Sequence, residues 1–97
     1  MNVRIESVKF DADAKLLDFT TQKVSKLDKF HDAIVGASVV LSLEPGHENK
    51  KVAVKIEIPG NNLVVERTST TFEDAVNSCV DVLKESLKRS KEKQREK

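Results

Sequence analysis

A single long amphipathic helix is predicted over the last third of the chain, from about Phe72 to about Lys93. Apolar residues recur there at steps of three and four, the spacing that places side chains on one face of a helix. Thr70 or Thr71 can cap the first turn, and Thr70 with Glu73 fits a reciprocal capping box. The apolar face consists of Phe72, Val76, Cys79, Val80, Leu83 and Leu87, with Ala75 and Val82 beside it.

The second half of this helix is strongly basic. From Lys84 to Lys97 the chain has seven basic and three acidic residues, whereas the other 83 residues have ten basic and thirteen acidic ones. The net charge of +1 therefore hides a polarised molecule. Basic residues also suit the negative pole at the end of a helix, so the run fits either a solvated helix end or a binding surface.

The rest of the chain predicts four strands and one further helix. The strand-like segments span residues 2–10, 34–44, 51–58 and 63–69, the first with an irregularity near Ser7. Asp11 and Asp13 mark the start of the helix, whose apolar stripe ends near Phe30 or His31. Pro and Gly place turns at 45–49 and 59–62.

The predicted element order is therefore β-α-β-β-β-α, which belongs to the α+β class. The first two strands should pair in parallel around the first helix, and the next two should follow as antiparallel hairpins. This gives a four-stranded mixed sheet with two helices packed on one face. The other face, which carries Lys51, Lys55, Glu57 and Glu66, is left to water.

Length and composition limit the protein to one domain. Its 97 residues suffice for one core, which we place at residues 1–93, with 94–97 as a disordered basic tail. The start of the chain enters a strand directly, without a signal sequence, and no apolar run is long enough to span a bilayer. We therefore expect a cytoplasmic protein without a membrane partner. The single cysteine, Cys79, lies on the apolar stripe and is expected to be a buried small hydrophobe.

The sequence contains few of the residues that catalysis needs. His31 ends the first helix and His47 lies in a turn, and neither has the spacing of a metal ligand. The glycines are isolated, so there is no phosphate-binding loop. We expect no enzymatic activity, no cofactor, no metal and no small-molecule substrate. For His31, packing at the helix end is the expected role, and contact with RNA is the alternative.

The remaining candidate is an electrostatic surface. Because both helices lie on the same face of the sheet, their basic residues should form one continuous strip that neutralises nucleic-acid phosphates. The four phenylalanines are assigned to core faces, which leaves no aromatic platform for unpaired bases. The strip consists of Lys23, Lys26, Lys29, Lys84, Lys88, Arg89 and Lys91, with Lys93 and Arg95 extending it.

Several segments in register resemble one family, the ribosome hibernation-promoting factors and ribosome-associated translation inhibitors. The resemblance covers Met1 to about Lys93. It is carried by the residues KVSKLDKFHDAI from Lys23, SVVLSLE from Ser38, IPG from Ile58, and FEDAVN from Phe72 with the basic helix end that follows.

This resemblance implies a fold similar to a double-stranded-RNA-binding domain with an extra strand. It also implies a stress or stationary-phase factor that binds the small ribosomal subunit and its ribosomal RNA, where it occupies the messenger and transfer RNA channel and inhibits translation. RNA contacts then fall on Lys23, Lys26, Lys84, Lys88, Arg89 and Lys91. At Val82, Glu85 and Ser90 the chain departs from the basic or polar residues typical of the family. Without a second domain, it resembles the short form.

Two alternatives remain open from the residues. A general double-stranded-RNA binder should also carry basic groups in a strand-joining loop, and the turn at 45–49 has no Lys or Arg. A protein-interaction module would instead dock the basic helix end on an acidic partner.

Overall fold

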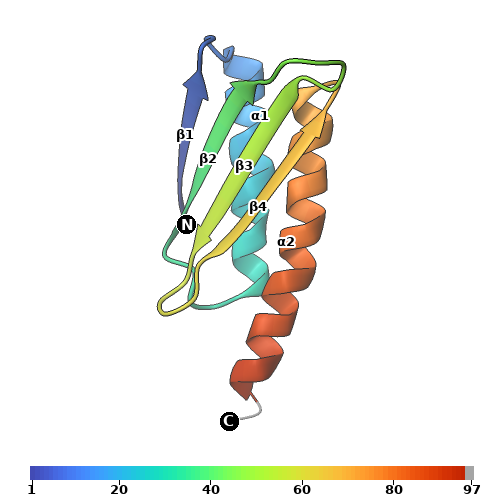
Figure 1. The fold of residues 1–97 in the computed structure, drawn as a ribbon. Helices are drawn as coiled ribbons and strands as arrows, with labels where there is room; N and C mark the ends of the chain where they lie inside the picture. The colour runs from blue at the N-terminus through green and yellow to red at the C-terminus, as the bar shows by residue number, and fades with distance from the viewer. Residues whose placement is uncertain (96–97) are drawn as a thin grey trace.

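The structure, a computed structural model, describes the backbone of residues 1–95 and the side chains as far as Lys91. Its elements confirm the predicted order, with one addition, a 3₁₀ helix that continues the first helix. They are β1 (Asn2–Val8), α1 (Ala14–Ser25), η1 (Lys26–Phe30), β2 (Gly36–Leu43), β3 (Lys50–Glu57), β4 (Leu63–Ser69) and α2 (Phe72–Arg95). The strands lie in the sheet in chain order, as Figure 1 shows.

Strand pairing also follows the prediction. β1 and β2 are parallel, with Asn2 opposite Gly36, and both later pairs are antiparallel. A β-carbon at Gly36 would lie 3.0 Å from the carbonyl oxygen of Asn2, so the absence of a side chain permits the close approach of β1 at this point. The pairing continues through Ser7 to Val8, and Lys9 follows with a positive φ of 68°. The irregularity predicted near Ser7 is therefore found just after the strand.

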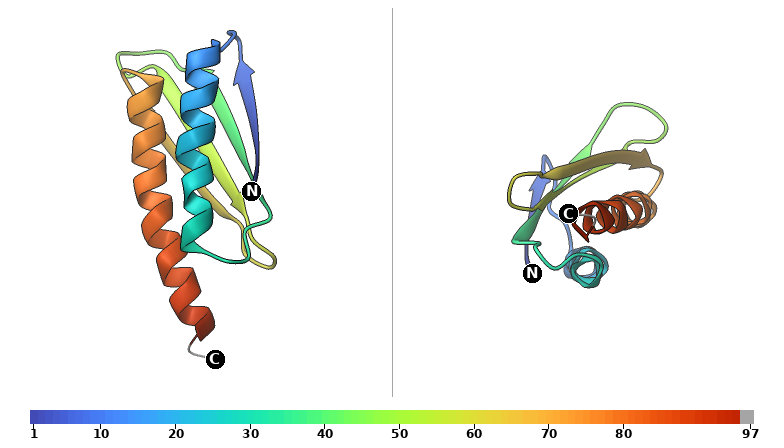
Figure 2. Two further views of the ribbon diagram at one scale, coloured as in Figure 1. Left: turned by 180° about the vertical axis from the view of Figure 1, so that it is seen from behind. Right: turned by 90° about the horizontal axis from the view of Figure 1, so that it is seen from below.

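Helices α1 and α2 lie side by side on one face of the sheet and run in the same direction (Figure 2). The second half of α2 extends past the end of the sheet (Figure 1). The core lies between the two layers, where alternate strand residues meet the apolar faces of the helices. Its fully buried members include Val24, Leu27, Ala37, Leu41, Val52, Val54, Ile56, Ala75, Val76, Cys79, Leu83 and Leu87.

Two residues that belong to the apolar alternation of the strand predicted at 34–44 are exposed. Val35 is 62% exposed and Leu43 is 40% exposed, whereas Val39 between them is 1% exposed. The reason is the length of β2, which starts at Gly36 and ends at Leu43. Val35 precedes this strand and Leu43 is its last residue, so alternation alone predicted a longer buried face than the fold has.

The outer face of the sheet carries ion pairs that link its strands and the segment after β2. Lys51 Nζ lies 2.9 Å from a carboxylate oxygen of Glu66 and 3.2 Å from one of Glu44, and Arg4 pairs with Glu57. The hydrogen bonds to Glu66 and Glu44 raise the pKa of the Lys51 ammonium. The face left to water is thus polar, and these charges are paired.

The two helix starts confirm Asp13 as a cap and, of the two threonines predicted for the last helix, Thr71. Asp13 accepts a hydrogen bond from the backbone N–H of Leu16 at 2.9 Å, as expected for an N-cap. At α2 the hydroxyl of Thr71 accepts from the N–H of Asp74 at 3.1 Å. Thr71, one residue later than the predicted box of Thr70 with Glu73, therefore caps this helix.

Replacing Thr71 with Ala should lower the free energy of unfolding by about 1 kcal/mol, because the substitution leaves the Asp74 N–H without its acceptor. Thr70→Ala, one residue away and also exposed, is the matched control and should change it by less than about 0.5 kcal/mol. Urea denaturation of both variants measures the difference. Equal losses would show that the cap contributes nothing specific.

At its other end, α2 reaches Arg95, two residues beyond the predicted domain boundary. Residues 94 and 95 are therefore helical and not a disordered tail. The prediction for residues 96 and 97 lies outside the described residues.

Candidate nucleic-acid interface

Three of the predicted basic residues gather around one aromatic ring. The ammonium groups of Lys29, Lys84 and Lys88 lie 5.3, 5.4 and 5.5 Å from the centroid of the Phe30 ring. Such distances allow a cation–π attraction to the face of the ring. We refer to Lys29, Lys84 and Lys88 with Phe30 as the lysine cluster. None of the three lysines forms an ion pair with a side chain that the structure describes.

Two elements bring the lysine cluster together. Lys84 and Lys88 stand one turn apart on α2, so they share a face of that helix. Lys29 and Phe30 end η1, where the chain has changed from α to 3₁₀ geometry. A 3₁₀ helix has three residues per turn. The Phe30 side chain therefore points in a different direction from the one it would have in a continued α-helix. The half-buried ring thus lies beside α2, next to the half-buried Lys84 and the exposed Lys29 and Lys88.

The other basic residues do not all continue this cluster. Lys23 lies 5.7 Å from the ring centroid of Phe19, farther back on α1, and Lys26 is exposed on η1. Lys91 forms an ion pair with Asp32, at 3.4 Å. The acidic partner therefore reduces the positive charge that Lys91 offers to a ligand.

Arg89 belongs to a different part of the surface. It lines a pocket of about 210 Å³ together with Asn61, Leu63, Ser86 and Ser90. These five residues, which we call the Arg89 pocket, join α2 to the turn between β3 and β4. The expected continuous strip is thus divided into a lysine cluster and a separate arginine site.

His31 is a buried residue, only 1% exposed. Its Nδ1 accepts a hydrogen bond from the backbone N–H of Ala33 at 3.1 Å, and its Nε2 lies 3.4 Å from Ser90 Oγ. The ring therefore packs between the segment that follows η1 and the second half of α2. This position supports the expected packing role and removes the ring from direct contact with a large ligand.

Cys79 is fully buried, and its thiol lies 3.5 Å from the carbonyl oxygen of Val52. Burial raises the pKa of this thiol to about 11, which keeps it uncharged at neutral pH. A neutral thiol without solvent access is a poor nucleophile. The structure thus agrees with the expectation of a small core residue.

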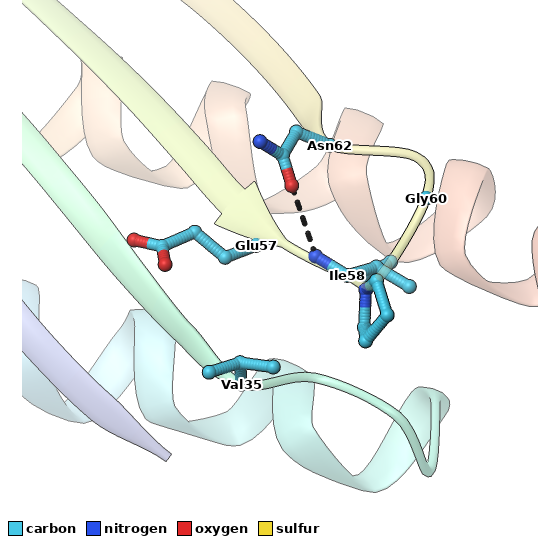
Figure 3. Close-up of a pocket in the computed structure, with 6 residues that line it drawn as sticks. Val35, Glu57, Ile58, Gly60 and Asn62 are labelled. Atoms are coloured by element: carbon cyan, nitrogen blue, oxygen red, sulfur yellow. Dashed lines mark hydrogen bonds between the residues drawn. The ribbon is translucent and has the colours of Figure 1, made fainter.

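A second pocket, of about 250 Å³, lies where β3 ends (Figure 3). The side chain of Asn62 accepts a hydrogen bond from the N–H of Ile58 at 3.2 Å and so closes the turn. Glu57 is the only ionisable side chain in the lining that the structure describes, and it already pairs with Arg4. This lining contains no nucleophile with a base beside it, as general catalysis would need.

The described part of the chain offers neither a metal-binding cluster nor a membrane span. No group of three or more His, Cys, Asp or Glu side chains there has the geometry to hold a metal ion. No described helix is both long and apolar enough to cross a bilayer.

Sequence reasoning missed three participants in these two surfaces. Phe30 was assigned to the core, although its half-buried ring organises the lysine cluster. Asn61 and Ser86 were not singled out at all. No local signal identifies them, because their pocket forms only when α2 packs beside the turn before β4.

The comparisons with known proteins agree with this architecture. The ribosome hibernation promoting factor of Pseudomonas putida is 27% identical over 94 residues, which cover 97% of this chain and 90% of that protein. The crystal structure of the Thermus thermophilus Protein Y N-terminal domain superposes with a TM-score of 0.81 at 26% identity, covering 92% of this chain and 98% of that domain.

A ribosomal subunit interface protein from Coxiella burnetii has a TM-score of 0.82 at 18% identity, over 94% of this chain and 98% of its own, and supports the fold. The family model described as sigma 54 modulation protein / S30EA ribosomal protein matches residues 3–95. The chain therefore belongs to the S30AE ribosomal protein family, in which the resemblance had placed it.

Proposed function

We propose that this protein binds the small ribosomal subunit in the cytoplasm and inhibits translation by occupying the channel of messenger and transfer RNA. Family membership supports ribosome-associated hibernation, and it also confirms the expectation of a non-enzymatic protein. The observation that carries the proposal is the lysine cluster, which is a site for an anion.

Electrostatics explain why an anion belongs there. Three positive charges within 5.5 Å of one ring centroid repel one another. No described side chain forms an ion pair with these lysines, and an anion bound there would relieve the repulsion. RNA phosphates supply such an anion and release their own condensed counterions, which favours binding at low salt.

The outer face of the sheet indicates which side of the molecule meets RNA. Its ion pairs, such as Lys51 with Glu44 and Glu66, occupy charges that phosphates would otherwise contact. The helical side carries the lysine cluster together with Lys23 and Lys26. We therefore propose that α1, η1 and α2 face ribosomal RNA, with Lys91 a weaker contact because of Asp32 and Arg89 a contact at a separate point.

Binding of this kind does not read base sequence, since ammonium groups contact phosphates and not base edges. The shape of the channel then has to supply specificity. While the protein occupies it, messenger and transfer RNA are excluded, and initiation resumes only after the protein leaves.

The proposal is tested by cosedimentation of the purified protein with small subunits. Subunits are used either empty or filled beforehand with messenger and initiator transfer RNA. We expect binding to empty subunits and its loss when the channel is filled. Equal binding to both would contradict occlusion, and binding to free duplex RNA without preference for the subunit would favour the general RNA-binding alternative.

A further inference from the structure

The Arg89 pocket contains hydrogen-bond donors and no described acid. Besides Leu63, its lining offers the Arg89 guanidinium, the Asn61 amide and the hydroxyls of Ser86 and Ser90. A guanidinium presents several N–H donors in a fixed plane, which suits the oxygens of a phosphate. A volume of about 210 Å³ admits one such group with its surrounding water.

His31 determines how Ser90 takes part. Because Nδ1 accepts the N–H of Ala33, that nitrogen carries no hydrogen, and in the neutral ring the hydrogen is on Nε2. Nε2 then donates to Ser90 Oγ, 3.4 Å away. The Ser90 oxygen is thereby used as an acceptor, and its own O–H is left to donate elsewhere.

The pocket is one direction open to that O–H, because Ser90 lines it beside Arg89. A buried ring thus leaves a donor available at the surface. The geometry of the donors differs from the lysine cluster, where three flexible ammonium groups surround a ring. The lysine cluster is suited to diffuse charge. The Arg89 pocket is suited to a single group held by several directed hydrogen bonds.

We propose that the Arg89 pocket binds a single phosphate group, with His31 as the positioning residue for Ser90. The phosphate is either a phosphodiester of an RNA backbone or free phosphate, since both present the same oxygens to the donors. This inference does not depend on the proposed occupation of the ribosomal channel. Phosphate binding by the isolated protein and exclusion of messenger RNA from the subunit are measured separately, so either can fail alone.

The first test is a titration of the ¹⁵N-labelled protein with inorganic phosphate at constant ionic strength, followed by NMR. We expect saturable shifts at Asn61, Ser86 and Ser90. Arg89→Ala should weaken the affinity about tenfold or more, because a hydrogen bond to a charged group is lost. Lys15→Ala removes the same charge from an exposed position at the start of α1, outside both surfaces, and should weaken it less than about twofold.

A second titration with a dinucleoside monophosphate distinguishes the two sources. Saturation of the same residues by this phosphodiester assigns the pocket to an RNA backbone, and saturation by inorganic phosphate alone assigns it to free phosphate. Shifts that do not saturate with either probe would overturn the proposal. Equal weakening by Arg89→Ala and Lys15→Ala would also overturn it, since diffuse charge would then explain the binding.

The role of His31 has its own measurement. Long-range ¹H–¹⁵N spectra of the imidazole should show the hydrogen on Nε2, and a hydrogen on Nδ1 would refute the positioning role. His31→Gln, which retains an N–H donor, should keep more phosphate affinity than His31→Leu. A pure packing role predicts no such difference between variants that remain folded by circular dichroism.

Discussion

Simultaneous replacement of Lys29, Lys84 and Lys88 with Ala should make binding to the small subunit both weaker and less sensitive to salt. Each phosphate contact contributes about 0.9 to the slope of log affinity against log salt concentration. Loss of three contacts should therefore reduce the slope by roughly 2.7. Between about 50 and 200 mM salt, the original protein should lose about 40-fold more affinity than the variant. Cosedimentation over this salt range measures both slopes.

Three other exposed lysines provide a matched control. Lys9, Lys15 and Lys55 lie away from the lysine cluster, and their replacement with Ala changes the net charge by the same amount. This control variant should retain most of the salt slope, because its phosphate contacts remain and only its long-range electrostatic field changes. If both triple variants reduced the salt slope equally, the binding site would lie outside the lysine cluster. The net charge of the protein would then be the only source of its attraction to RNA.

The fold was largely predictable because its signals are local. The Pro and Gly turn before it and the helix start after it predicted β4 at Leu63–Ser69 despite weak alternation, and the structure shows the same limits. Helical periodicity predicted α2 and its buried residues, such as Leu83 and Leu87. The failures occur at the ends of elements, where Val35 and Leu43 are exposed. The period of apolar residues along a strand does not show where the buried part of that strand ends.

The candidate site was less predictable because it depends on side-chain direction. Lys88 and Arg89 are neighbours in sequence, yet a step of one residue on a helix rotates a side chain by about 100°. Lys88 consequently faces Phe30, whereas Arg89 faces Asn61. The sequence places both residues on one basic helix. It does not show that Lys88 and Arg89 contribute their charges to two different surfaces. The contact between His31 and Ser90, which joins residues 59 apart, has no local signal either.

Replacement of Leu83 with Ala should lower the free energy of unfolding by about 2 to 5 kcal/mol, because Leu83 is fully buried and the substitution leaves a cavity. For a domain of this size, each 1 kcal/mol corresponds to a fall of about 4–8 °C in Tm. Leu17→Ala is the matched control, since Leu17 is a helical leucine that is 37% exposed, and it should cost less than about 1 kcal/mol. Urea denaturation compares the two, and equal losses would contradict the assignment of the core.

The comparison of this variant with the lysine variant separates folding from binding. Leu83 lies on the buried face of α2 and Lys84 on the partly exposed one, so adjacent residues serve different purposes. At a temperature where Leu83→Ala remains folded, it should bind small subunits with the original salt slope, because every phosphate contact is still present. The triple lysine variant should show the reverse, with nearly unchanged stability and a reduced slope. If Leu83→Ala flattened the slope while folded, the positions of the lysines would depend on the packing beneath them, and the site would have to be described as a property of the whole helix pair.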